Sequence, residues 1–185
     1  MDCYSIAKFL HVACAVLWLG GGFGLMLAAV VADRARNRDD FLSAVRLTTI
    51  LAPRIFIPGS LIVLALGLAM MWLGGWRWDA WIVIGLAGFV AASAIGGGKL
   101  GPAAAATGRL AAEGRFAEAV ATGRAMLRFA KVEYVIQAVI VFVMVAKPGW
   151  SDHAVLSALA LAAGTAILAI LTAPVRATGR TPTAA

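Results

Sequence analysis

The sequence predicts an all-α protein, a polytopic transmembrane bundle of about five helices with its N-terminus outside and its C-terminus in the cytoplasm. Three observations predict this class: the composition, a series of long apolar segments, and the uneven distribution of basic residues. Of the 185 residues, 62% are hydrophobic and only 14% are charged, and the mean hydropathy is +0.91. Soluble domains are nearer half apolar and about a quarter charged, so the composition excludes an ordinary water-facing fold.

The apolar segments cover about residues 4–31, 55–73, 79–97, 129–146 and 153–174. They form a single domain over residues 1–176, and a polar tail follows at 177–185. Each segment approaches the roughly 20 residues that a helix needs to cross a hydrocarbon core of about 30 Å. The first segment is too long for a signal-peptide core and does not begin with basic residues, so we expect a retained helix.

The basic residues predict the orientation of the bundle in a bacterial inner membrane. All but three of the 16 basic residues lie on one side, in two connections and the tail. They are Arg34, Arg36, Arg38, Arg46, Arg54, Lys99, Arg109, Arg115, Arg124, Arg128, Lys131, Arg176 and Arg180. The positive-inside rule places this side in the cytoplasm. Aromatic rings prefer membrane interfaces, and five tryptophans flank the predicted outer ends. These are Trp72, Trp76, Trp78, Trp81 and Trp150.

The second and third segments carry signals for helix shape and packing. Pro53 and Pro58 interrupt the hydrogen-bond ladder at the inner entrance of the second segment, so we expect a kink there. A surface helix is expected to extend this segment back to Asp39. The third segment contains Gly85 and Gly88, small residues that let a neighbouring helix approach closely.

The connection between the third and fourth segments is the longest polar stretch of the chain. Its core, residues 108–128, is rich in alanine with scattered Arg and Glu. We expect either a surface helix on the cytoplasmic interface or a solvated helical linker.

The fourth segment holds a buried ionisable group, Glu133, with Gln137 one helical turn further on. The expected role of Glu133 is an ion pair with Arg54 or Arg128, and a proton route is the alternative. His153 begins the fifth segment after an aspartate, and we expect it to be exposed on the outer side.

The first helix carries the candidate chemistry. Helical spacing places Tyr4, Lys8, His11, Ala15, Trp18 and Gly22 on one face, and we expect this face to turn towards the bundle. A histidine in an apolar helix usually faces a partner or a cavity. Imidazole is a frequent ligand of haem iron and copper, but on spacing alone a hydrogen bond to a neighbouring helix is the commoner explanation. Gly20 with Gly24, and Gly21 with Gly22, are expected to allow close helix packing or the approach of a flat ring.

Several function classes find no motif in the sequence. There is no phosphate-binding loop, dinucleotide fingerprint, HExxH motif or serine elbow. No basic stripe with interleaved aromatic residues indicates nucleic-acid binding. The two cysteines, Cys3 and Cys14, are too far apart along one helix to bridge each other.

A family resemblance starts from the first two segments. The runs Lys8–Val12 and Ala15–Gly21 resemble the opening of a family of bacterial predicted integral membrane proteins of unknown function. The run from Ile55 to Leu68 resembles the second helix of that family. Its first helix is similar to those of copper-resistance protein D and the haem-containing bacterial protoporphyrinogen oxidase. The resemblance implies that His11 binds haem.

Three hypotheses follow for the function. The first is a haem-binding redox or electron-transfer protein, with His11 as the metal ligand and Lys8, Trp18, Gly21 and Gly22 beside the cofactor. The second is a copper-handling protein that uses His11, Cys14 and methionines. The third is an accessory or structural subunit without a cofactor. The expected partners are membrane lipids, together with a membrane redox partner or a second copy of the chain. The sequence alone does not decide whether the protein is an enzyme.

Overall fold

The computed structural model describes residues 2–174, and within this part of the chain every regular element is a helix. Five continuous rods are long and apolar enough to cross a membrane, which confirms the predicted all-α class and the number of long apolar helices. They comprise α1 (Cys3–Arg34), α2–η1–α3 (Arg38–Leu51, Ala52–Phe56 and Ile57–Leu73), α4–η2–α5 (Ala80–Ile95, Gly96–Leu100 and Gly101–Ala112), α6 (Phe116–Ala146) and α7 (His153–Thr172). The predicted polar tail, with Arg176 and Arg180, lies outside the described residues.

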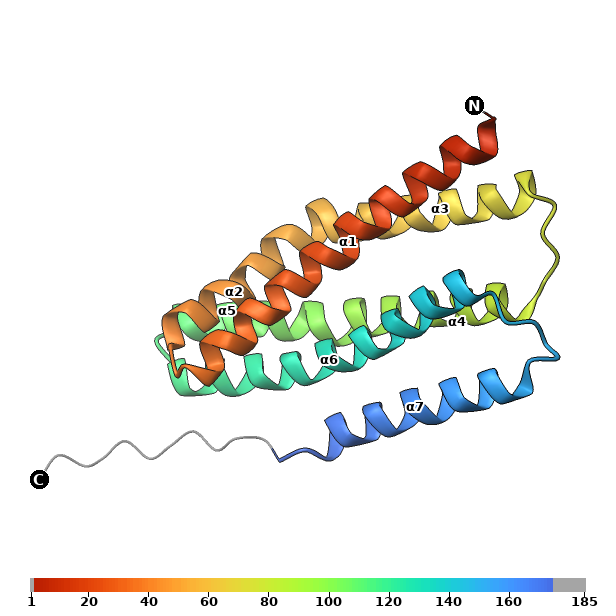
Figure 1. Cartoon of the computed structure of the whole chain (residues 1–185). Helices are drawn as coiled ribbons and strands as arrows, with labels where there is room; N and C mark the ends of the chain where they lie inside the picture. Colours follow the sequence, from red (N-terminus) through yellow and green to blue (C-terminus); the bar gives the residue numbers. More distant parts are fainter. Residues whose placement is uncertain (1, 175–185) are drawn as a thin grey trace, which may run out of the picture.

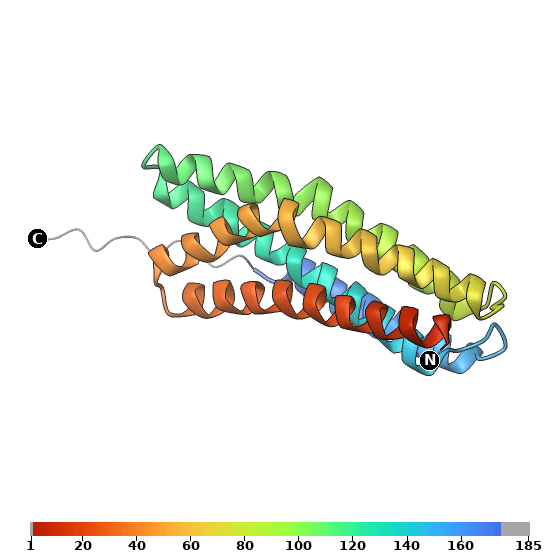
Figure 2. The same cartoon turned by 90° about the horizontal axis from the view of Figure 1, so that it is seen from above.

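The five rods run alternately up and down the bundle (Figures 1 and 2). The first rod packs along the second, the third packs along the fourth, and α7 lies beside α6. Short connections at residues 35–37 and 113–115 join rods at one end, and longer connections at 74–79 and 147–152 join them at the other. The chain therefore passes from end to end five times, as the odd number of predicted spans requires.

Four of the rods are longer than a membrane needs. With a rise of 1.5 Å per residue, the 32 residues of α1 extend over about 48 Å, whereas a hydrocarbon core is about 30 Å thick. The 20 residues of α7 match that thickness. Figure 1 shows α7 beside the half of the bundle that contains α3 and α4, while α2 and α5 lie beyond its end. The half of the bundle that contains α2 and α5, residues 26–51 and 101–128, is called the helical extension below.

The helical extension has its own apolar core. Phe41 and Val45 of α2 are buried against Ala29 of α1, Ala104 of α5 and Met126 of α6. Water-facing helices bury such a stripe because the hydrophobic effect favours its removal from water. By contrast, α7 contains no buried residue. The hydrophobic cluster of buried residues therefore lies in the half of the bundle that extends past the end of α7.

The connection between the third and fourth spans differs from both expectations of the sequence. It is neither a helix lying on the interface nor a solvated linker, because α5 and the first half of α6 pack against each other and against α2. They reverse direction at residues 113–115, where Gly114 has a φ of +75°, a conformation that favours glycine. The small side chains of buried Ala104 and Ala119 allow close contact between these helices.

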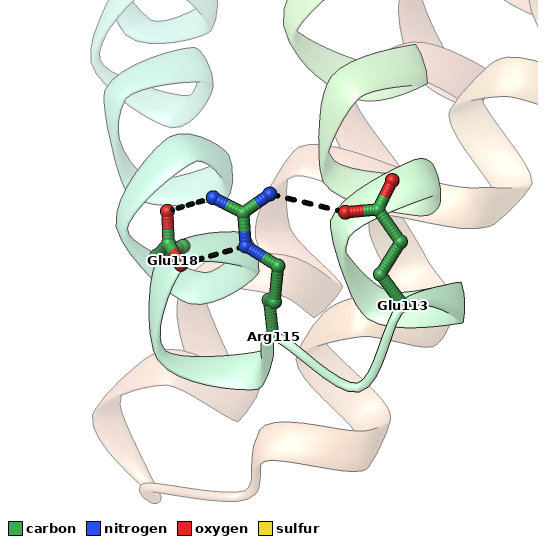
Figure 3. Close-up of polar contacts among 3 residues, drawn as sticks. All are labelled: Glu113, Arg115 and Glu118. Carbon is green, nitrogen blue, oxygen red and sulfur yellow. Dashed lines mark hydrogen bonds and ion pairs between the residues drawn. The ribbon is translucent and has the colours of Figure 1, made fainter.

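An arginine fixes this reversal. Arg115 binds Glu113 at 3.1 Å and Glu118 at 2.6 Å, as Figure 3 shows. These hydrogen bonds, first to Glu118 and then to Glu113, raise the pKa of the Arg115 guanidinium above its usual range. All three side chains are about half exposed, so the contribution to stability is small.

The predicted irregularity near Pro53 and Pro58 is confirmed. Residues Ala52–Phe56 form a π-helical turn between α2 and α3. The third rod has a second π-helical turn at Gly96–Leu100, just before Pro102. Proline removes a backbone donor and clashes with the preceding turn, and a wider turn relieves this clash. Both π-turns lie where the membrane-length half of the bundle meets the helical extension.

Aromatic rings gather at the end opposite the basic connections. The rings of Trp76 and Trp81 meet edge to face, with centroids 5.6 Å apart. The ammonium of Lys147 lies 4.3 Å from the Trp76 centroid and 5.2 Å from that of Trp81. The indole of Trp150 donates a hydrogen bond to the carbonyl of Trp78 at 3.1 Å. This clustering agrees with the interfacial position that the sequence predicts for these tryptophans.

Candidate functional site

His11 is half-buried on α1 and faces α3. Its Nδ1 atom lies 2.9 Å from the carbonyl oxygen of Val63. Gly67, one turn along α3, makes room for the ring, because a Cβ there would lie 3.2 Å from the His11 Cε1 atom. The sequence did not single out Val63 or Gly67, since a backbone acceptor leaves no signal in a side-chain pattern.

This contact determines the chemistry that His11 offers. A carbonyl oxygen only accepts hydrogen bonds, so the bond requires a hydrogen on Nδ1 of His11. In the neutral ring, the lone pair then belongs to Nε2. Metal-binding histidines commonly donate their other ring N–H to a carbonyl in this way. The same bond also ties α1 to α3 without any metal.

Trp18 occupies the next part of the same face. Its ring lies 6.3 Å from that of Phe89 on α4, and its Cβ lies 3.9 Å from the position that a Cβ on Gly59 would take. Trp18 therefore connects the α1–α3 pair of helices with the α4–α6 pair. His11 and Trp18 confirm that this face of α1 turns towards the bundle.

The glycines of α1 divide into two kinds. A Cβ on Gly21 would lie 3.5 Å from the Phe56 ring, and a Cβ on Gly22 would meet the hydroxyl of Tyr134. Gly20 and Gly24 have open space around them, so the small-residue pair expected at these two positions makes no helix contact.

Tyr134 also packs edge to face on Phe23, with ring centroids 5.5 Å apart. The sequence pattern did not point to Tyr134, although a lone tyrosine in an apolar helix is a usable signal. Tyr134 and Phe56 thus take the space beside Gly21 and Gly22.

The remaining candidate residues form no cluster with His11. Lys8 is exposed on α1, one helical turn outward from His11. Cys14 is half-buried on α1, and His153 is exposed at the start of α7. Among residues 2–174, no three His, Cys, Asp or Glu side chains are grouped as a metal site. A metal at His11 would need further ligands beyond a ready-made cluster, such as porphyrin nitrogens or methionine sulfur.

Glu133 does not form the expected ion pair. Its Oε1 atom accepts a hydrogen bond from the Gln137 amide at 3.2 Å. Arg54 instead donates to the carbonyl of Ile50 at 3.0 Å, and Arg128 donates to carbonyls at the end of α7. Helix carbonyls therefore bind these arginines in place of Glu133, and those at the end of α7 lack their usual helical partners.

Comparison with known proteins gives one match. The family described as "Predicted integral membrane protein (DUF2269)" matches residues 5–148, which include the first four rods and end before α7. No curated protein and no solved structure matches the chain.

Proposed function

The chain belongs to the DUF2269 family of predicted integral membrane proteins, and from that premise we propose a haem-binding redox or electron-transfer protein of the bacterial inner membrane that uses His11. Its N-terminus faces outward and its C-terminus lies in the cytoplasm. Basic residues between the spans support this orientation, because all of those in the described part except Arg77 and Lys147 gather at the end with the helical extension.

One observation carries the haem proposal: the 2.9 Å contact between Nδ1 of His11 and the carbonyl of Val63. It orients the ring and leaves Nε2 as the metal-binding atom. It also supplies the polar contact that usually accompanies a histidine ligand. Haem iron bound at Nε2 would supply one-electron chemistry, by cycling between its ferric and ferrous states.

The residues around His11 fit this role unequally. Lys8 is exposed and long enough to reach a carboxylate such as a haem propionate. Trp18 offers an aromatic ring on the same face, partly covered by Phe89. Gly21 and Gly22 lie against Phe56 and Tyr134, which leaves less room there for a flat ring. The proposal therefore depends on His11, with Lys8 and Trp18 as neighbours.

An absorption spectrum tests the proposal. The full chain is expressed in cells supplied with a haem precursor and purified in mild detergent, and we expect a Soret band. His11→Asn is the sharpest variant, because its amide N–H can still reach the Val63 carbonyl but offers no imidazole nitrogen to the iron. It should insert and melt like the wild type yet lose the Soret band. His153→Asn, at the exposed histidine, is the matched control and should keep it.

Other results would replace the haem proposal with one of its alternatives. A colourless wild type, or a His11→Asn variant with full haem content, would contradict haem binding by His11. Metal analysis of that colourless protein then separates the other two hypotheses. Bound copper that depends on His11 and Cys14 would favour copper handling, and a metal-free protein would favour an accessory subunit in which His11 only ties α1 to α3.

A further inference from the structure

A pocket of about 430 Å³ opens between α1, α6 and α7, near the C-terminal end of α7. Four cationic side chains line it: Arg34, Arg124, Arg128 and Lys131. Asp33 supplies the one carboxylate of the lining. Cations therefore outnumber anions in the pocket, although it lies between apolar helices.

Two of these cations are already engaged. Arg124 pairs with Asp33 at 2.7 Å, and both side chains are less than a fifth exposed. Arg128 donates hydrogen bonds to the carbonyl of Leu171 at 3.3 Å and to that of Ala173 at 2.6 Å. These carbonyls belong to the end of α7, where a helix leaves acceptors without partners. Arg128 thus fastens α7 to α6 and shapes one wall of the pocket.

The other two cations are available to a ligand. Arg34 and Lys131 are exposed, and within residues 2–174 neither side chain makes a hydrogen bond or ion pair with the protein. Because they line the same pocket, an anion between them would neutralise charge that the described part of the protein leaves uncompensated.

The pocket also lies at the end of a membrane-length helix. Since α7 has 20 residues, it spans about 30 Å, which is one hydrocarbon thickness. A membrane crossed by α7 would therefore have its lipid headgroups at the level of the pocket. Apolar side chains of Val30, Leu127 and Ile170 complete the lining. A small soluble anion would leave this apolar surface uncovered, whereas a phospholipid presents a phosphate beside glycerol and acyl carbons.

We propose that this pocket binds the phosphodiester headgroup of an anionic phospholipid. Arg34 and Lys131 contact the phosphate, as basic pockets between membrane helices do at the cytoplasmic side. The apolar lining contacts the glycerol and the start of the acyl chains. Because α7 buries none of its own residues, the lipid also supplies packing between α7 and the rest of the bundle. This proposal is independent of any cofactor at His11.

Native mass spectrometry of the full chain in mild detergent tests the site. The protein is titrated with phosphatidylglycerol and, separately, with zwitterionic phosphatidylcholine. The test variant is Arg34→Gln with Lys131→Gln, which leaves the Asp33–Arg124 pair and the Arg128 bonds intact. The control is Arg46→Gln with Arg109→Gln, because both residues are exposed near the same end but lie outside the pocket. Melting in lipid-free detergent checks that both variants fold.

We expect wild type to bind phosphatidylglycerol more tightly than phosphatidylcholine. The test variant should bind it about 25-fold more weakly, the change that two contacts of about 1 kcal/mol each produce. The control should change by about threefold or less. Equal binding of the two lipids would overturn the proposal, and so would an equal loss in the control. Displacement of the lipid by millimolar inorganic phosphate would overturn it in favour of a soluble-anion site.

Discussion

The carboxylate of Asp33 and the guanidinium of Arg124 lie 2.7 Å apart, although 91 residues separate them in the chain. The pair joins the end of α1 to the first half of α6 within the helical extension. Its side chains are 18% and 17% exposed, respectively, so removing one partner leaves a largely desolvated charge behind.

Asp33→Asn is therefore expected to lower the free energy of unfolding by about 1–3 kcal/mol. Asp39→Asn provides the matched control, because Asp39 pairs with Arg38 in a setting where the two side chains are 78% and 50% exposed. That change should cost about 0.5 kcal/mol or less. Chemical denaturation in detergent measures both values. Equal losses of unfolding free energy would show that the buried pair contributes no more to stability than the exposed pair.

Gly123→Ala tests the core of the helical extension. A Cβ at this position would lie 2.7 Å from Cε1 and 2.9 Å from Cζ of Phe41, a fully buried ring. We expect destabilisation of about 1–3 kcal/mol, because an overpacked core must shift its neighbours. At Gly108, also helical, nothing lies within 4 Å, so Gly108→Ala should stabilise the protein by about 0.5–1 kcal/mol. A neutral Gly123→Ala would contradict the α2–α6 contact.

His11→Leu tests the tie between α1 and α3 separately from any cofactor. Loss of the hydrogen bond to Val63 should lower the free energy of unfolding in haem-free detergent by about 1 kcal/mol. The neighbouring Val12 is 51% exposed, and Val12→Leu should change stability by less than about 0.5 kcal/mol. Thermal or chemical unfolding measures both variants. Equal changes in the free energy of unfolding would show that His11 has no special structural role.

Reporter fusions test the proposed orientation. Fusions after residues 36 and 115 should report the cytoplasm, since these turns lie at the basic end of the bundle. Fusions after residues 76 and 150 should report the outside, where the tryptophans gather. Paired alkaline phosphatase and green fluorescent protein reporters give opposite signals at each site. A cytoplasmic signal after Trp150 would contradict the proposed orientation.

The membrane-length half of the bundle was predictable because its signal is apolar length. Five runs near 20 residues identify five crossings whatever their packing, and Pro53 with Pro58 identified a break in the ladder through covalent chemistry alone. The helical extension was not predictable in the same way. Residues 101–112 bury mainly Ala104 and Thr107, and such small side chains produce little apolar periodicity.

The candidate site was predictable only in part. The inward face of α1 followed from the spacing of His11 and Trp18, but their partners are a backbone carbonyl and Phe89, which spacing does not reveal. The packing glycines are Gly21 and Gly22, not Gly20 and Gly24, because the position of Tyr134 and Phe56 decides which glycine meets a neighbour. Charge alone predicted an ion pair between Glu133 and an arginine. In the structure, Arg54 and Arg128 instead donate hydrogen bonds to backbone carbonyls.

α7 differs from the first four rods because it contains no buried residue. The family match ends at residue 148, five residues before α7 begins. The match thus covers the first four rods from residue 5 onward, and these rods hold every buried apolar side chain of the core between residues 2 and 174. The fifth rod contacts α6 without burying a side chain of its own. Truncation before α7 should therefore leave the apolar core of the other four rods intact.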